Sequence, residues 1–290
     1  MFTLKKVLFP VDFSDRCRGA ARLLEALHTN FEPEITLVHV LPPPHLEYTM
    51  TDLGGGLIQD YTVARLGQVR KDLNYFLDDE LKHFPIKRVL LEGDPGRKLI
   101  DYAHTDGSNL VVMPTHGYGG FRRFMLGSVT AKVLHDADCP VLTGVHMEAI
   151  PDPADVHVRT VAAALDLSES SEKVLDYAAG FAEACNAKLL IIHVTPSIEG
   201  MTGEYFEPNW RERFEAEALR RISALQQKAG TMANTVMDYG DVGAGVSHMA
   251  KENDVGILVI GRGSSSGVFG RIRAHAYGII RQSPCPVISV

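Results

Sequence analysis

The stretch VLFPVDFS, residues 7–14, is an apolar run that ends in Asp-x-Ser, and the stretch VAAALDLS, residues 161–168, has the same form. The two aspartates, Asp12 and Asp166, are 154 residues apart. Three further pairs of short motifs follow in the same order: His39-Val40 with His193-Val194, Gly93-Asp94 with Gly240-Asp241, and Cys139-Pro140-Val141 with Cys285-Pro286-Val287. Four matches in register predict that the chain contains two copies of one domain.

The length agrees with this duplication, because 290 residues correspond to about two domains of ordinary size. The stretch EAIPDPAD, residues 148–155, is polar and interrupted by two prolines, as linkers often are. We therefore expect a first domain at residues 1–147, a linker at 148–158 and a second domain at 159–290.

Composition excludes several classes of protein. The chain has 29 Lys and Arg against 36 Asp and Glu, and this net charge of −7 argues against binding of nucleic acid through phosphate contacts. No apolar stretch approaches the 18 residues of a membrane span, and the first residues lack the apolar core of a signal peptide. Four cysteines without a C-x-x-C pair indicate neither a disulfide framework nor a zinc site. We expect a cytoplasmic protein.

Short apolar segments alternate with helical ones in each copy. In the first copy we expect strands at 7–11, 35–40, 89–92, 110–113 and 141–145, and helices at 15–28, 58–83, 96–105 and 128–137. The second copy repeats the strands at 161–165, 188–194, 234–237, 257–260 and 287–290. This alternation predicts α/β domains, each with a doubly wound parallel sheet covered by helices on both faces.

Ligands of such sheets bind beyond the carboxyl ends of the strands. After the fourth strand stands the glycine-rich stretch MPTHGYGGFRRFMLGSVT, residues 113–130, in which Gly127-Ser128 opens the next helix. Glycines let backbone amides approach an anion, and a helix N-terminus offers free N–H groups to phosphate. The strand, loop and helix together predict a phosphate cradle without a lysine, although a plain turn and helix cap would explain the same residues.

Other nucleotide-binding motifs are absent from the sequence. It has no G-x-x-x-x-G-K-[ST] stretch, which excludes a P-loop enzyme, and no G-x-G-x-x-G follows the first strand.

At these residues the chain resembles the universal stress protein family in its tandem form. The family pattern joins Pro-x-Asp after the first strand, His-Val in the second, G-x-x-G-x9-G-[ST] after the fourth and Cys-Pro-Val at the last. This chain follows the pattern over essentially its whole length, except that Pro114 replaces the first glycine and removes an N–H. The resemblance implies flavodoxin-like or Rossmann-like domains of five strands in the order 3-2-1-4-5.

The resemblance also implies one ATP per chain, in the first domain. Asp12 and Val40, with the neighbouring Pro10 and Val11, would hold the adenine and ribose. Met113 and Pro114 would line the pocket, and His116 matches a residue common in the motif. The phosphates would lie on Gly117, Gly127, Ser128, Val129 and Thr130. A divalent ion such as Mg²⁺ would offset the phosphate charge.

The second copy departs from the family pattern in its loop. Counted back from Cys-Pro, Arg273-Ala274 stands where Gly127-Ser128 stands in the first copy. We therefore predict weak or no ATP binding there. Arg262, Arg271 and Arg273 either bind a different anion or belong to a solvated charged loop.

Several single residues have two interpretations. Asp12 is a binding residue in our interpretation, with a catalytic base or a cap of the following helix as alternatives. His39 and His193 are expected to be core groups, and Cys139 and Cys285 to pack at the last strands. The loop at 41–57 is a candidate lid, because it is rich in proline and glycine.

Three functions are compatible with these patterns. We favour an ATP-binding regulatory or protective protein that acts through a nucleotide-dependent partner. The alternatives are a slow ATPase or related nucleotide-processing enzyme, and a structural adaptor without nucleotide. The resemblance further implies pairing through the last strands, so that 141–145 and 287–290 would join the two copies as a pseudo-dimer, with or without a further homodimer.

Overall fold

The structure is a computed structural model, which describes residues 2–27, 30–43, 55–115, 126–144, 158–196, 210–262 and 271–290. Most of the expected linker at 148–158 and much of the candidate lid at 41–57 lie outside these residues. No helix in the described segments is long and apolar enough to cross a membrane.

Each half alternates strands and helices as the sequence predicts. The first half contains β1 (Lys6–Pro10), α1 (Asp15–Ala26), β2 (Glu34–Leu41), α2 (Gly55–Tyr75), β3 (Ile86–Glu92), α3 (Pro95–Asp106), β4 (Leu110–Val112), α4 (Ser128–Asp136) and β5 (Val141–Thr143). The second contains β6 (Thr160–Ala164), α5 (Ser171–Ala184), β7 (Lys188–Pro196), α6 (Trp210–Ala229), β8 (Asn234–Gly240), α7 (Val242–Glu252), β9 (Ile257–Ile260), α8 (Arg271–Gln282) and β10 (Val287–Ser289).

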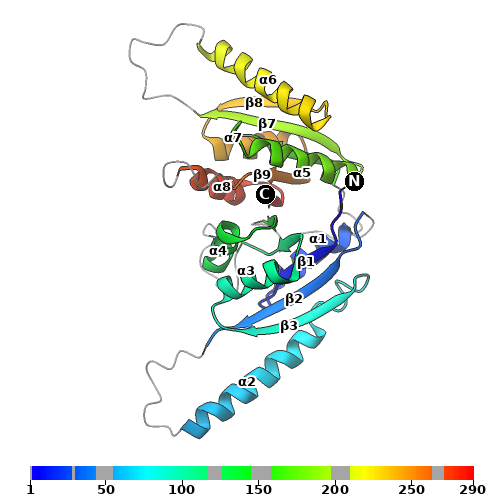
Figure 1. Ribbon diagram of the computed structural model, residues 1–290, viewed down its shortest axis with the longest axis vertical. Helices are drawn as coiled ribbons and strands as arrows, with labels where there is room; N and C mark the ends of the chain where they lie inside the picture. Colours follow the sequence, from blue (N-terminus) through cyan, green and yellow to red (C-terminus); the bar gives the residue numbers. More distant parts are fainter. Residues whose placement is uncertain are drawn as a thin grey trace.

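The strands form one sheet that runs through both halves (Figure 1). Its order is β3-β2-β1-β4-β5-β10-β9-β6-β7-β8, so each half has the expected order 3-2-1-4-5 with parallel neighbours. The halves meet where β5 and β10 pair antiparallel, with Ile288 opposite Leu142. The expected pairing of the last strands within one chain is therefore confirmed, and it covers two strand edges that would otherwise be exposed.

The core lies on both faces of this sheet, and each layer continues from one half into the other. The layer beneath α1 and α5 contains Phe9, Leu24 and Phe181, all buried. The opposite layer, beneath α3, α4, α7 and α8, is built from aliphatic side chains such as Leu8 and Leu134. Strands covered on both faces need apolar residues at every position, which explains why they are continuous apolar runs in the sequence.

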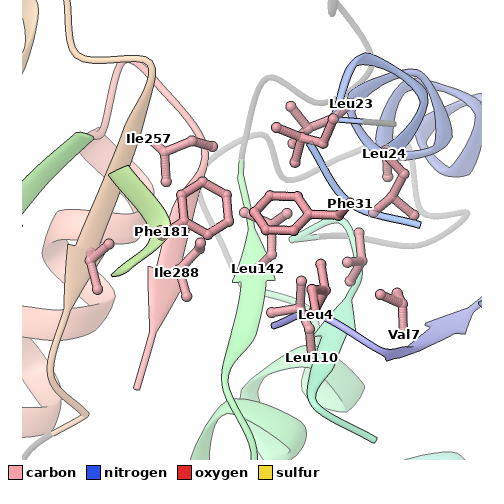
Figure 2. Close-up of a cluster of buried hydrophobic side chains, with 14 of the residues drawn as sticks. Leu4, Val7, Leu23, Leu24, Phe31, Leu110, Leu142, Phe181, Ile257 and Ile288 are labelled. Carbon is pink, nitrogen blue, oxygen red and sulfur yellow. The ribbon is translucent and has the colours of Figure 1, made fainter. Parts of the chain in front are cut away.

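Aromatic rings fasten the two halves on the α1 and α5 side. Phe31 of the first half stands against Phe181 of the second, with ring centroids 5.3 Å apart (Figure 2). Phe2 packs edge-on against Tyr177 and Phe181, at centroid distances of 5.1 and 5.7 Å. Gly180 makes room for it, because a Cβ there would lie 3.0 Å from the Phe2 ring.

The helix expected at 58–83 is too long, because α2 ends at Tyr75. Leu77 has a positive φ of 63°, which ends the helix, and the following turns bury Leu77 and Leu81 in the core. Burial of these two leucines therefore outweighs the cost of a left-handed backbone at a branched residue.

Candidate functional site

A cavity of about 440 Å³ opens at the carboxyl ends of the first half's strands. It lies where β1, β2 and β4 end and where α3 and α4 begin. Every predicted site residue that the structure describes lines it: Pro10, Val11, Asp12, Val40, Met113, Pro114, Gly127, Ser128, Val129 and Thr130. His116 and Gly117 lie outside the described residues. The cavity is within the size range of small-molecule sites.

Asp12 is held by the loop that follows β1. Its Oδ1 accepts hydrogen bonds from the Ser14 amide at 3.1 Å, the Ser14 hydroxyl at 2.6 Å and the Cys17 thiol at 3.2 Å. Ser14 therefore occupies the N-cap position of α1 without capping it through its side chain. Asp12 Oδ2 is buried and has no hydrogen-bond partner within the described part of the chain. Such an oxygen is costly unless a ligand donates to it.

The N-terminus of α4 also lines the cavity. Gly127 is the N-cap, with φ −61° and ψ 144°, an extended backbone that any residue could adopt. Its amide donates to Thr115 O at 2.8 Å, and its carbonyl accepts from the Ala131 amide at 2.8 Å. The amides of Ser128, Val129 and Thr130 belong to the first turn, where N–H groups have no intrahelical acceptor. They make this end attractive to an anion.

The Thr130 side chain makes a hydrogen bond within the protein. The buried hydroxyl donates to Pro114 O at 3.1 Å and so ties α4 to the loop after β4. The hydroxyl is thus already engaged, and only the Thr130 amide is left to contact an anion. Pro114 has no N–H to offer an anion, and its carbonyl accepts the hydrogen bond from the Thr130 hydroxyl.

The α4 helix carries a lysine that is not among the cavity-lining residues. Lys132 lies one turn after Ser128, and its Nζ is 2.9 Å from Asp94 Oδ1. Asp94 also caps α3 by accepting from the Arg97 amide at 2.8 Å. The Lys132 hydrogen bond, followed by that from Arg97, lowers the pKa of Asp94. Both side chains are substantially exposed, so this ion pair is weak and Lys132 can exchange Asp94 for another partner.

Five cavity-lining residues are missed by the sequence argument: Cys17, Val38, His39, Pro95 and Leu99. Burial, followed by the Asp12 carboxylate, raises the pKa of the Cys17 thiol to about 12. His39 Nδ1 lies 2.7 Å from Val11 O, and His193 repeats this with Leu165 O at 2.7 Å. His193 is a buried and bonded core group as expected, whereas His39 is bonded but only half-buried, and it lines the cavity. The sequence signal for this position in the cavity was that His39 directly precedes Val40, a predicted site residue.

The second half differs in the corresponding aspartate and in the start of the corresponding helix. Asp166 is exposed, whereas Asp12 is half-buried. The helix α8 begins 14 residues before Cys285, whereas α4 begins 11 residues before Cys139. Arg273 therefore lies within the first turn of α8 and not at its cap. The residues 263–270 of this loop lie outside the described residues.

A larger cavity, of about 900 Å³, lies at the amino ends of strands in the second half. It is lined by the first residues of β6, β7 and β8, namely Thr160, Lys188 and Asn234. Amino ends of strands are not where sheets of this type bind their ligands, so the smaller cavity is the better candidate.

Comparison with known proteins gives concordant results. The family model of the Universal stress protein family matches residues 3–143 and 157–290. Universal stress protein MJ0577 of Methanocaldococcus jannaschii is 27% identical over 155 residues, which cover 48% of this chain and 93% of that protein. Universal stress protein YxiE of Bacillus subtilis is 29% identical over 140 residues, which cover 44% of this chain and 95% of that protein.

Several similar solved structures cover both halves. A universal stress protein from Archaeoglobus fulgidus aligns over 99% of this chain and 96% of its own, with a TM-score of 0.70 and 19% identity. At this identity the likeness concerns the fold: two domains of the same type, arranged in one chain.

Proposed function

Because the chain belongs to the universal stress protein family, we propose that it binds one ATP in the first-half cavity and acts through a nucleotide-dependent partner interaction. In this proposal its role is regulatory or protective, and turnover of ATP is not its purpose. The four cysteines are free thiols, which suits the reducing cytoplasm that we propose as its location.

The observation that carries the proposal is that two complementary kinds of group line one cavity. The buried and unpartnered Asp12 Oδ2 suits a ligand that donates a hydrogen bond, as an adenine amino group or a ribose hydroxyl does. The first-turn amides of α4 suit phosphate. A nucleotide carries both groups, and apolar side chains such as Val40 and Leu99 line the same cavity.

A divalent ion would depend mainly on the phosphates. In the described segments no group of three or more His, Cys, Asp or Glu side chains is placed to hold a metal. Mg²⁺ would thus enter together with the nucleotide, since it prefers phosphate oxygens and water with few protein ligands.

The titratable groups that line the cavity favour binding over hydrolysis. The Cys17 thiol is kept protonated by its raised pKa, and His39 Nδ1 is engaged by a backbone carbonyl. Among the lining residues that the structure describes, Asp12 is the remaining candidate base, and its Oδ1 is already bonded to three donors. A slow ATPase stays the alternative, in which Asp12 Oδ2 would orient water.

The test is nucleotide binding to the purified full chain. We expect the denatured protein to release ATP at up to one per chain, and calorimetry to give one site and not two. Many turnovers of added ATP to ADP would favour the ATPase alternative. Neither released nucleotide nor measurable binding would refute the proposal.

A matched pair of variants tests the position of the site. Gly127→Asp should abolish ATP binding, because a carboxylate at the N-cap of α4 repels phosphate. Gly67→Asp adds the same charge to α2, where a Cβ meets nothing within 4 Å, and should leave binding unchanged. Retained ATP binding in Gly127→Asp would reject the assignment of this helix end to the phosphates.

A further inference from the structure

Arg262, which follows β9 of the second half, reaches into the first half. Its guanidinium donates to Ala137 O at 2.6 Å through Nη1 and to Cys139 O at 2.5 Å through Nη2. Nη1 also lies 3.5 Å from Leu134 O. The side chain is partly buried, and this burial lowers the pKa of the guanidinium. Arg262 thus belongs neither to a solvated loop nor, in this structure, to an anion site.

The three carbonyls belong to the C-terminal end of α4 and the turn before β5. The last carbonyls of a helix have no intrahelical donor, and the helix dipole places partial negative charge there. A guanidinium with its donors in a fixed fork satisfies several such carbonyls together. The far end of α4 is therefore held by a residue of the other half.

A second contact from the same half reaches the middle of α4. The Tyr277 hydroxyl of α8 lies 3.3 Å from Ala131 O and donates to it. Figure 1 shows α4 and α8 facing each other where the two halves meet. Together, Arg262 and Tyr277 fix α4 at two points along its nine residues.

The first half does not have the same residues at the positions that correspond to Arg262 and Tyr277, although the two halves are copies. The strand registers make Thr115 the counterpart of Arg262, and counting from Cys-Pro makes Ala131 the counterpart of Tyr277. The Thr115 hydroxyl lies 3.4 Å from Gly144 O of its own half, and threonine has no guanidinium to satisfy several carbonyls together. Alanine has no side-chain donor. At these two positions, the polar side chains therefore extend from the second half, whose glycine-rich loop is altered, to the first half, whose loop follows the family pattern.

From this asymmetry we propose that Arg262 is a positioning residue for the phosphate-binding end of α4, so that nucleotide binding in the first half is coupled to docking of the second. This inference rests on the proposed function, because it assigns the N-terminus of α4 to the phosphates. A helix moves largely as a rigid rod, so releasing one end shifts the amides at the other. Only the part of a ligand that contacts those amides should then lose affinity.

The experiment compares ATP with adenosine on the full chain, by calorimetry or by competition. Arg262→Ala should weaken ATP binding about tenfold, the scale of losing a charge-assisted hydrogen bond, and leave adenosine binding unchanged. Arg262→Lys should recover part of the loss, since one ammonium reaches fewer carbonyls than the guanidinium fork. Asn30→Ala is the control, because it removes another bond across the joint, from Asn30 Nδ2 to Ala184 O at 3.2 Å. Asn30→Ala should alter neither ligand.

The outcomes separate the inference from the proposed function. If Arg262→Ala weakens ATP and adenosine equally, or changes neither, the positioning role is wrong while ATP binding stands. If Arg262→Ala does not fold, Arg262→Lys decides, and equal effects on both ligands again reject the role. If the unaltered chain binds no nucleotide, the proposed function itself fails and this inference falls with it.

Discussion

At the scale of single residues, the two halves use one device to orient an aspartate. Asp166 Oδ1 accepts from the Ser168 amide at 2.9 Å, the Ser168 hydroxyl at 2.6 Å and the Ser171 hydroxyl at 3.0 Å. Asp12 repeats this arrangement, with the Cys17 thiol in place of the Ser171 hydroxyl. The Asp-x-Ser motif thus builds each aspartate into the start of the next helix. Binding and helix-start roles are therefore compatible for Asp12.

The Cys17 thiol should make stability depend on pH above 9. Its pKa is raised from 9.0 to about 12 by burial and by the Asp12 carboxylate. An unfolded thiol ionises near pH 9 while the folded one stays protonated, so the stabilisation is complete below pH 9 and is lost as the pH rises above it. Cys17→Ser removes this titration. Urea unfolding of both proteins should show the wild-type losing about 1 kcal/mol more than the variant between pH 8 and 10.

Parallel loss of stability in the two proteins would contradict this prediction. The substitution itself is mild, because serine already occupies the corresponding position 171 and bonds the corresponding aspartate there.

At the scale of elements, the strands were predictable because their burial on both faces leaves a continuous apolar run in the sequence. The end of α2 was not predictable, since it depends on a left-handed Leu77 that no local signal marks. The residues that line the cavity likewise divide into predictable and unpredictable ones. Residues beside the strand ends follow from the motifs, whereas Pro95 and Leu99 reach it only because α3 packs beside α4.

The hydrogen bond from the Thr130 hydroxyl to Pro114 O, which joins α4 to the loop after β4, can be tested at this scale. Thr130→Val keeps the shape of the side chain but leaves Pro114 O without its donor in a buried place. We expect a loss of about 1–2 kcal/mol in the free energy of unfolding, measured in urea. Thr130→Ser retains the hydroxyl and should recover the hydrogen bond. Equal stabilities of the serine and valine variants would show that this bond contributes nothing.

At the scale of the whole molecule, the duplication and the pairing of the last strands were readable from the sequence and its family resemblance. The contacts that make the halves unequal were not. Arg262 stood out only as a charge in a glycine-rich loop, and its partners are backbone carbonyls, which leave no trace in a sequence. The joint also depends on Phe2, which precedes the first recognisable strand and packs against rings of the second half.

Phe181 is the residue through which the joint can be tested. It is fully buried in α5 of the second half, and its ring contacts Phe2 and Phe31 of the first. Phe181→Ala should cost about 3–5 kcal/mol, as removal of a buried aromatic ring usually does. Because the ring belongs to a layer shared by both halves, hydrogen exchange should accelerate in β4 and β5 as well as in β6 and β9. Ile222→Ala, a buried position in α6 away from the joint, should instead affect mainly β6, β7 and β8. If Phe181→Ala leaves exchange in β4 and β5 unchanged, the halves are stabilised independently and the continuous layer does not couple them.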